Sequence, residues 1–279
     1  MRNKLYFYPE LSSYDFGWFR LSGPGLANCL FVAARAYICA VKENGVFISP
    51  TWAKFSIGPY LRGESDKRHY VGLFKKCGVT GWRKFCLIIA AKFGFGSITK
   101  IKGLGNYFED LREDAEIIRD YINKLILDKA LNKVNREELT NSVAVHIRLG
   151  DYTSVNRIPI SWYVEIINEI HKIAPDREIL IFSDGTTSEL SEVLRLPRTR
   201  LAYYGNAMAD IVAISQCALV IASDSTFSAW GAFLGNKPVV FSKRHFPSVF
   251  SANSTPEVVL GDCTQLPVII QSVLSEKDC

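Results

Sequence analysis

The sequence predicts an α/β fold built on a parallel sheet, and three observations lead to this prediction. In the second half, short apolar runs such as 143–145 alternate with segments of helical period such as 161–173. Alternation of this kind is typical of a parallel sheet covered by helices on both faces. Hydrophobic residues make up 48% and charged residues 22% of the chain, as in folded globular proteins. The length of 279 residues fits two domains.

The first half predicts a strand, a turn, a helix and a second strand in that order. We expect a strand near 16–21, the turn Ser22-Gly23-Pro24-Gly25, a helix over 26–44 and a strand at 46–48. Asn44-Gly45 is typical of a helix C-terminus. A glycine turn lets a ligand approach the backbone, and the helix start after it favours anions. The alternative is a turn that only connects two elements.

The middle of the chain is basic and aromatic. Residues 51–106 have no clear period, whereas 109–131 return to a helical pattern. No acidic residue occurs between Lys67 and Phe108, and the basic residues there are interleaved with aromatic ones, among them Trp82 and Phe93. Such a segment suits an anionic lipid surface or a nucleic acid. The third interpretation is the solvated face of a helical subdomain.

The second half supplies the remaining elements. We expect strands at 143–145, 178–182, 200–203, 218–222 and 238–241, and helices at 161–173, 188–194, 208–217, 225–234 and 264–274, with Ser161 as the cap of the first helix. The polar stretch 132–141 is the predicted linker, so the domains are 1–135 and 136–279. The first would hold an insertion at about 60–108.

Polar side chains follow three of the predicted strands. His146 and Arg148 follow the strand at 143–145, Asp184 follows 178–182, and the run 223–228 (Ser-Asp-Ser-Thr-Phe-Ser) follows 218–222. The carboxyl ends of parallel strands lie at one edge of a sheet, where ligands bind. A guanidinium there matches phosphate oxygens, and a serine-rich helix start can bind them too. The alternatives are a structural Arg–Asp pair in a surface loop and a simple helix cap.

Several function classes are excluded or disfavoured. The chain has no Walker sequence, and no Asp-x-Asp pair offers a metal to a diphosphate. Arg148 and helix dipoles would therefore neutralise a diphosphate without a metal. No nucleic-acid-binding module is recognisable, so no nucleic acid is expected as a partner.

The cysteines and the apolar runs predict the cellular compartment of the protein. The seven cysteines are scattered without metal-ligand spacing, and the start does not resemble a signal peptide, which favours a reducing cytosol. The longest membrane candidate, 85–91, is far below the ~20 residues that a spanning helix needs. We expect a cytoplasmic protein, either soluble or peripheral on the inner face of the membrane.

Several motifs resemble those of a known family. His146-Ile147-Arg148-Leu149-Gly150-Asp151-Tyr152 resembles the HxRRxDY motif of the α-1,2-fucosyltransferases, glycosyltransferase family 11. Further stretches resemble family motifs that occur in the same order along the chain. Residues 25–31 resemble the family's GLGNQLF, 160–163 resemble the helix after the HxRRxDY motif, and 181–184 resemble the family's FSD. Residues 210–217, which run into 223–232, resemble the motif that ends in SSFSWWGA.

This resemblance implies a GT-B-like fold, in which two Rossmann-like α/β domains face a cleft, with the N-terminal domain on the acceptor side. It implies inverting, metal-independent transfer of L-fucose from GDP-fucose to a galactose-type hydroxyl. The product would be an α-1,2 linkage in a bacterial surface glycan, on an acceptor that is free or lipid-linked. No cofactor is expected, and the donor sugar nucleotide and the acceptor would be the partners.

The resemblance also implies roles for individual residues. Arg148 would hold the diphosphate and stabilise the departing GDP, His146 would contact the donor, and Asp210 would bind guanine. The remaining donor contacts would be Asp184, Ser225, Thr226 and Phe227 from the C-terminal domain, and Gly25 and Asn28 from the N-terminal one.

This chain departs from the family at four of the motif positions. Leu149 stands where the family has its second arginine, Ala229 replaces one tryptophan of the WW pair, Ala27 replaces a glycine, and Cys29 replaces a glutamine. Asp151 is a candidate general base, and the alternative is that it orients Arg148. Two other functions remain open: transfer from another nucleotide sugar, and non-catalytic nucleotide binding.

Overall fold

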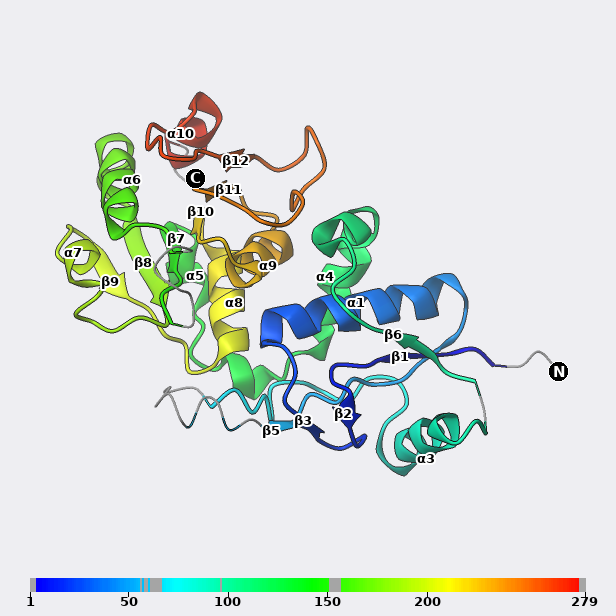
Figure 1. The fold of residues 1–279 in the computed structure, drawn as a ribbon. Coiled ribbons are helices and arrows are strands. Elements are labelled where there is room, and N and C mark those ends of the chain that lie inside the picture. The colour runs from blue at the N-terminus through cyan, green and yellow to red at the C-terminus, as the bar shows by residue number, and fades with distance from the viewer. Residues whose placement is uncertain are drawn as a thin grey trace. The chain divides into compact units, whose positions relative to one another are not determined.

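The computed structural model describes residues 4–55, 57, 60, 67–95, 97–150 and 157–275. The chain forms two compact units, unit 1 (Met1–Asn132) and unit 2 (Lys133–Cys279) (Figure 1). The boundary expected from the sequence, after residue 135, lies three residues from this division. Each unit is described by itself below.

Unit 2 contains a six-stranded parallel sheet in the order β12-β11-β10-β7-β8-β9. Its strands are β7 (Ser142–Ile147), β8 (Glu178–Ser183), β9 (Thr199–Leu201), β10 (Leu219–Ala222), β11 (Val239–Phe241) and β12 (Glu257–Val259). The chain proceeds from β7 outward to β9, then returns to β10 on the other side of β7. The strand order therefore reverses between β7 and β10, as in a Rossmann fold. The predicted parallel sheet is confirmed, and β12 is an addition that the sequence did not indicate.

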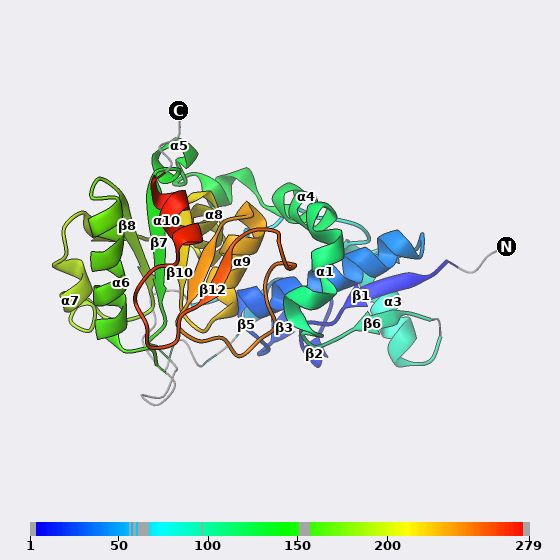
Figure 2. The same cartoon turned by 90° about the horizontal axis from the view of Figure 1, so that it is seen from above.

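Helices cover both faces of this sheet (Figure 2). They are α5 (Arg136–Leu139), α6 (Ile160–Ile173), α7 (Ser191–Leu194), α8 (Ala207–Gln216), α9 (Thr226–Gly235) and α10 (Val268–Ser275). Apolar residues of α6, α7 and α10 form one buried cluster with the β7, β8 and β10 side chains of one face, while α8 and α9 pack against each other. The prediction that Ser161 caps α6 is wrong, because the helix begins one residue earlier, after Pro159, with no side-chain cap.

Unit 1 is built around a smaller parallel sheet in the order β4-β1-β6. Its strands are β1 (Tyr6–Pro9), β4 (Val46–Phe47) and β6 (Thr99–Ile101). The helix α1 (Leu26–Lys42) packs against β1, as does α3 (Gly81–Lys92) through Ile88 and Tyr8. A second sheet contains β2 (Tyr14–Asp15), β3 (Arg20–Leu21) and β5 (Lys54–Phe55), and α4 (Ala115–Leu125) packs on α1.

Two predictions for unit 1 are corrected by the structure. Residues 16–19 are not a strand but the turn of a hairpin between β2 and β3, closed by Phe16 N donating to Phe19 O at 3.0 Å. The first strand of the parallel sheet is β1 instead. The helical pattern over 109–131 is also interrupted, because the extended backbone of Ile126 ends α4.

Two further observations concern segments singled out by the sequence. The helix predicted at 26–44 is confirmed as α1, and Asn44 beyond its end has a left-handed backbone with φ 48°. In the part of the chain that the structure describes, no helix is both long and apolar enough to cross a membrane.

Candidate functional site

A buried histidine occupies the point where the strand order of unit 2 reverses. His146 lies near the carboxyl end of β7, and its Nδ1 is 2.8 Å from Ser223 Oγ and 3.1 Å from Ser228 Oγ. Its ring stacks on Phe227 with centroids 5.2 Å apart. Burial first, and then the charge of Arg148, lower the pKa of His146 to about 3. The imidazole is therefore neutral at physiological pH, so it can contribute hydrogen bonds but no positive charge.

Arg148 is held in place by Asp184 from the neighbouring strand. Arg148 Nη1 lies 2.8 Å from Asp184 Oδ2. The other carboxylate oxygen, Oδ1, accepts the backbone N–H groups of Leu149 at 2.8 Å and Gly150 at 3.1 Å. Both side chains remain about a quarter exposed. The guanidinium is thus oriented by a fixed carboxylate at the carboxyl edge of the sheet while it stays accessible to a ligand.

Two glycines make this arrangement sterically feasible. A Cβ at Gly150 would lie 2.5 Å from Asp184 Oδ2, and a Cβ at Gly185 would lie 2.5 Å from Leu149 Cδ1. A side chain at either position would therefore require Asp184 or Leu149 to move, which would disturb the ion pair or the packing of Leu149. The side chain of Leu149 is itself buried within the apolar cluster beneath α6. Because an unpaired charge in that cluster would be costly, an arginine at position 149 would have to take another orientation than Leu149 does.

The N-terminus of α9 lies at the same edge. Ser225 caps this helix by accepting from Phe227 N at 3.2 Å, as the alternative interpretation of the serine-rich run expected, and its contact with a donor stays a prediction. Thr226, the first residue of the helix, is nearly buried. The helix contains no acidic residue in its first turn, and its N-terminus carries partial positive charge. An anion bound beside Arg148 would therefore meet favourable potential from the helix as well.

Asp210 lies in the first turn of α8, the helix that follows β9. Its Oδ1 accepts from Tyr204 N at 2.7 Å, and Tyr204 stacks on Phe182 of β8 with centroids 6.1 Å apart. The carboxylate is thus tied to the segment between β9 and α8. The role of Asp210 toward a guanine base stays a prediction.

Gly25 and Asn28, two further candidates from the sequence, lie at the start of α1 in unit 1. Gly25 is the N-cap residue of α1, and a Cβ built there would meet no heavy atom of the described residues within 4 Å. Packing inside unit 1 therefore does not require a glycine at this position. Asn28 is partly exposed in the first turn of the helix. Asp151, the remaining catalytic candidate, lies outside the described residues.

Sequence reasoning missed two buried cations that contact the glycine turn at 22–25, just before α1. Arg20 is fully buried and donates to Ser22 O at 2.7 Å, to Thr51 O at 3.1 Å and to Cys29 Sγ at 3.2 Å. Lys54 is also buried and donates to Gly23 O at 2.9 Å. Among the described residues, Arg20 forms no ion pair. Their signal in the sequence was weak, because neither cation belongs to a motif.

These cations explain the sequence around the turn. A Cβ at Gly23 would lie 2.6 Å from Arg20 Nη1, and Gly23 has φ +95°, which other residues rarely adopt. Cys29, which stands where the family has a glutamine, is buried and accepts from Arg20. The start of α1 therefore combines a helix N-terminus with two positive charges, which favours an anion.

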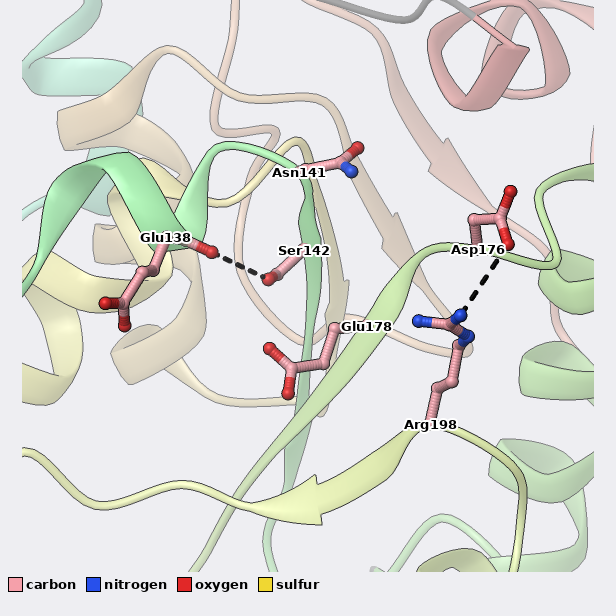
Figure 3. A pocket seen from close by; sticks show the side chains of 6 residues that line it. All are labelled: Glu138, Asn141, Ser142, Asp176, Glu178 and Arg198. Atoms are coloured by element: carbon pink, nitrogen blue, oxygen red, sulfur yellow. Dashed lines mark hydrogen bonds and ion pairs between the residues drawn. The ribbon is translucent and has the colours of Figure 1, made fainter.

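A cavity of unit 2 lies away from the residues around Arg148. A cavity of about 320 Å³ opens at the amino-terminal ends of β7 and β8 (Figure 3). It is lined by Glu138, Asn141, Ser142, Asp176, Glu178 and Arg198. Three of these six side chains are carboxylates, which would repel a phosphate. The cavity lies at the opposite edge of the sheet from Arg148, where a Rossmann fold does not place its ligand.

The low pKa of His146 predicts a loss of stability in acid. Above about pH 6.5 the residue is neutral in both the folded and the unfolded chain, so its contribution is complete there. As the pH falls toward about 3, only the unfolded chain gains this proton, and stability falls by about 1.4 kcal/mol for each pH unit. Denaturant unfolding measured from pH 7 to pH 4 tests this. The His146→Gln variant should lose this part of the slope, and parallel curves for both proteins would contradict the assignment.

The sequence is similar to those of known proteins. The family model of glycosyl transferase family 11 matches residues 96–250, more than half of the chain. The O-antigen biosynthesis glycosyltransferase WbnK of Escherichia coli is 26% identical over 122 residues, which covers 39% of this chain and 40% of that protein. The chain thus matches less than half of the length of this curated relative.

Solved structures share the fold at low identity. The fucosyltransferase NodZ from Bradyrhizobium has a TM-score of 0.53 at 12% identity and covers 79% of this chain and 93% of its own. The structure of NodZ α-1,6-fucosyltransferase soaked with GDP-fucose has a TM-score of 0.53 at 13% identity, over 79% and 92% of the two chains. The predicted GT-B-like α/β fold class is confirmed. By the match over residues 96–250, the chain belongs to glycosyl transferase family 11.

Proposed function

We propose that this protein is an inverting, metal-independent fucosyltransferase that transfers L-fucose from GDP-fucose to a galactose-type hydroxyl in α-1,2 linkage. The observation that carries the proposal is the Arg148 guanidinium, fixed by Asp184 at the point where the strand order reverses. Membership of glycosyl transferase family 11 supports it. So does the fold shared with a fucosyltransferase whose crystals were soaked with GDP-fucose.

The proposed chemistry is the departure of GDP from the sugar. The acceptor oxygen forms a bond to C1 of fucose while the bond from C1 to the β-phosphate oxygen breaks, and the electron pair of that bond stays on the diphosphate. Arg148 and the N-terminus of α9 would stabilise this developing charge. His146 is neutral and buried, so we assign it a hydrogen bond to the donor, with Ser223 and Ser228 fixing its ring.

The remaining donor contacts follow from the same proposal. Thr226 and Phe227 would line the phosphate and nucleoside pocket, and Asp210 would accept hydrogen bonds from guanine. Gly25 and Asn28 would approach the diphosphate, with the buried charges of Arg20 and Lys54 behind them. The acceptor hydroxyl must lose its proton, and the sequence offers Asp151 for this step. At a pKa of about 3, His146 would be a weak base for it.

The acceptor is proposed to belong to a bacterial surface glycan. The related protein from Escherichia coli is named for O-antigen biosynthesis, and the match to it supports this substrate class. The burial of Leu149, where the family has a second arginine, favours one alternative, a donor other than GDP-fucose. With one cationic side chain fewer after β7, the sugar and the diphosphate would be held differently.

A donor screen tests the proposal directly. The protein is incubated with GDP-fucose, GDP-mannose or UDP-galactose and a panel of galactosides, with and without EDTA, and products are identified by mass spectrometry. We expect transfer from GDP-fucose only, unchanged by EDTA. NMR of the product should show fucose in the α configuration, linked to the 2-hydroxyl of the galactose. Any other linkage or transferred sugar overturns that part of the proposal. GDP binding without transfer to any galactoside would favour the non-catalytic alternative.

A further inference from the structure

Unit 1 carries an exposed aromatic surface formed by the β2–β3 turn and one face of α3. We call it the aromatic patch, and it consists of Phe16, Trp18, Phe19, Trp82, Phe85 and Phe93. Phe16, Trp18 and Phe19 are between 42% and 48% exposed, Trp82 is 69% exposed and Phe93 is 72% exposed. Large aromatic side chains that gather on a surface mark a site of interaction.

Ring contacts join the two segments into one surface. Trp18 from the turn stacks on Phe85 of α3 with centroids 4.6 Å apart and meets Trp82 edge-on at 5.1 Å. Along α3 the apolar side chains at 82, 86, 89 and 93 share one helical face, because they are spaced by three or four residues. Trp82 and Phe93, the C-cap residue of α3, therefore lie on the same side of the helix, with Cys86 and Ile89 between them.

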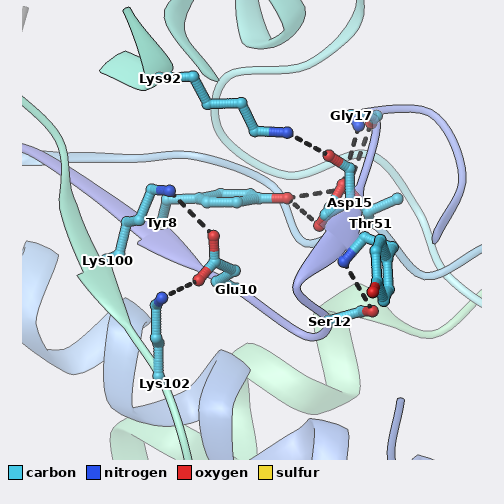
Figure 4. A network of polar contacts seen from close by, with 10 residues as sticks. Tyr8, Glu10, Ser12, Asp15, Gly17, Thr51, Lys92, Lys100 and Lys102 are labelled. Carbon is cyan, nitrogen blue, oxygen red and sulfur yellow. Dashed lines mark hydrogen bonds and ion pairs between the residues drawn. The ribbon is translucent and has the colours of Figure 1, made fainter. Parts of the chain in front are cut away.

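A buried polar network holds the turn in place (Figure 4). The hydroxyl of Tyr8 on β1 donates to Asp15, which accepts from Gly17 N at 2.8 Å in the turn. Thr51 Oγ1 donates to Gly17 O at 3.3 Å and accepts from Lys84 Nζ of α3 at 2.7 Å. Asp15, Thr51 and Lys84 are all buried. The aromatic side chains are thus presented outward by a turn and a helix that are fixed to the same core.

The charge around the aromatic patch is positive. Arg83 and Lys92 of α3 are exposed, and Lys92 Nζ lies 5.9 Å from the centroid of the Phe16 ring. No acidic residue occurs between Lys67 and Phe108, and Asp15, the acidic residue of the supporting network, is buried. A second copy of the chain would bring the same positive charge to this surface and be repelled. A bilayer with anionic headgroups would attract it.

We propose that the aromatic patch is a docking surface for an anionic phospholipid bilayer. Trp18, Trp82 and Phe93 would enter the boundary between headgroups and acyl chains, with α3 lying in the plane of the interface, while Arg83 and Lys92 contact the headgroups. This proposal does not depend on the transferase activity, because it concerns a surface of unit 1 alone.

Vesicle flotation tests the proposal without donor or acceptor. The full chain is mixed with vesicles of phosphatidylcholine alone or with added phosphatidylglycerol, and binding is measured after density centrifugation. We expect flotation with the anionic vesicles. The Trp82→Ser/Phe93→Ser double variant should reduce the partition coefficient at least about tenfold. Arg83→Gln should reduce it about fivefold, since one basic residue near the surface contributes about that factor. Val268→Ser removes an apolar side chain that is 79% exposed on α10, and it should change nothing.

Several results would overturn the proposal. They are absence of wild-type flotation, equal flotation with neutral vesicles, and unchanged flotation of the double variant with a wild-type circular dichroism spectrum. Light scattering after size-exclusion chromatography measures the oligomeric state and gives a further contrary result. A wild-type dimer that the double variant converts to a monomer would assign the aromatic patch to self-association instead.

Discussion

Arg148→Ala is expected to lower kcat/KM for transfer about 10²- to 10³-fold while the protein keeps its fold. In the proposed reaction the guanidinium meets the charge of the departing diphosphate, and removal of one such preorganised donor costs about 3–4 kcal/mol of transition-state stabilisation. Its side chain is partly exposed and makes its ion pair at the edge of the sheet, so the melting temperature should change little. Initial rates with GDP-fucose and calorimetric binding of GDP measure the two effects.

Two further variants give this prediction a control. Arg148→Lys keeps the charge but not the planar fork, so an intermediate rate is expected. Arg200→Ala removes an arginine of the same sheet that pairs with Glu178, at 2.7 Å from Nε to Oε1, away from the carboxyl edge of β7. It should retain wild-type rates. If Arg148→Ala and Arg200→Ala transfer equally well, Arg148 does not stabilise the leaving group.

Asp184→Ala should show the second largest effect, a loss of activity of about 10²-fold together with lower stability. Asp184 orients Arg148 and accepts two backbone N–H groups from the loop after β7. Without it the guanidinium loses its fixed position, and a misplacement of about 1 Å is enough for a loss of this size. The backbone groups lose a charged acceptor, which should lower the free energy of unfolding by about 1–3 kcal/mol. Steady-state rates and urea unfolding provide the measurements.

A double-mutant cycle separates positioning from direct contact. If Asp184 acts through Arg148, then Arg148→Ala/Asp184→Ala should be about as slow as Arg148→Ala alone. Asp184→Asn keeps an oxygen for Leu149 N and Gly150 N but lacks the ion pair, so it should retain stability better than Asp184→Ala. Asp176→Ala is the matched control, because Asp176 pairs with Arg198 at 3.7 Å on the opposite edge of the sheet. Fully additive losses from the two site variants would argue that Asp184 contacts the donor independently.

The alternation of unit 2 was predictable because its signals are local. Each strand is a short apolar run and each helix has an apolar stripe, so the parallel sheet and the convergence of His146, Arg148, Asp184 and Ser225 at one edge followed from the pattern. The hairpin and β1 were not predictable in the same way. Phe16 and Phe19 are exposed, and their apolar character, which suggested a strand, belongs to a surface turn.

Partnerships between distant residues could not be read from the sequence. Asp184 was expected to contact the donor, and Asp151 was the residue considered for orienting Arg148. In the structure Asp184 pairs with Arg148, because the register aligns Ile147 on β7 with Ser183 on β8. The contact between the buried Arg20 of β3 and Cys29 of α1 also depends on how β3 and α1 pack together.

The sequence by itself determined the α/β class, the glycine turn before α1 and the family motifs, because each depends on neighbouring residues and on local backbone preferences. Only the tertiary structure decided which carboxylate holds Arg148, that Leu149 points into the core, and that aromatic side chains from two segments meet on one surface. The physical reason is that burial, electrostatic pairing and ring contacts depend on strand register and helix packing. These bring together residues more than 30 positions apart.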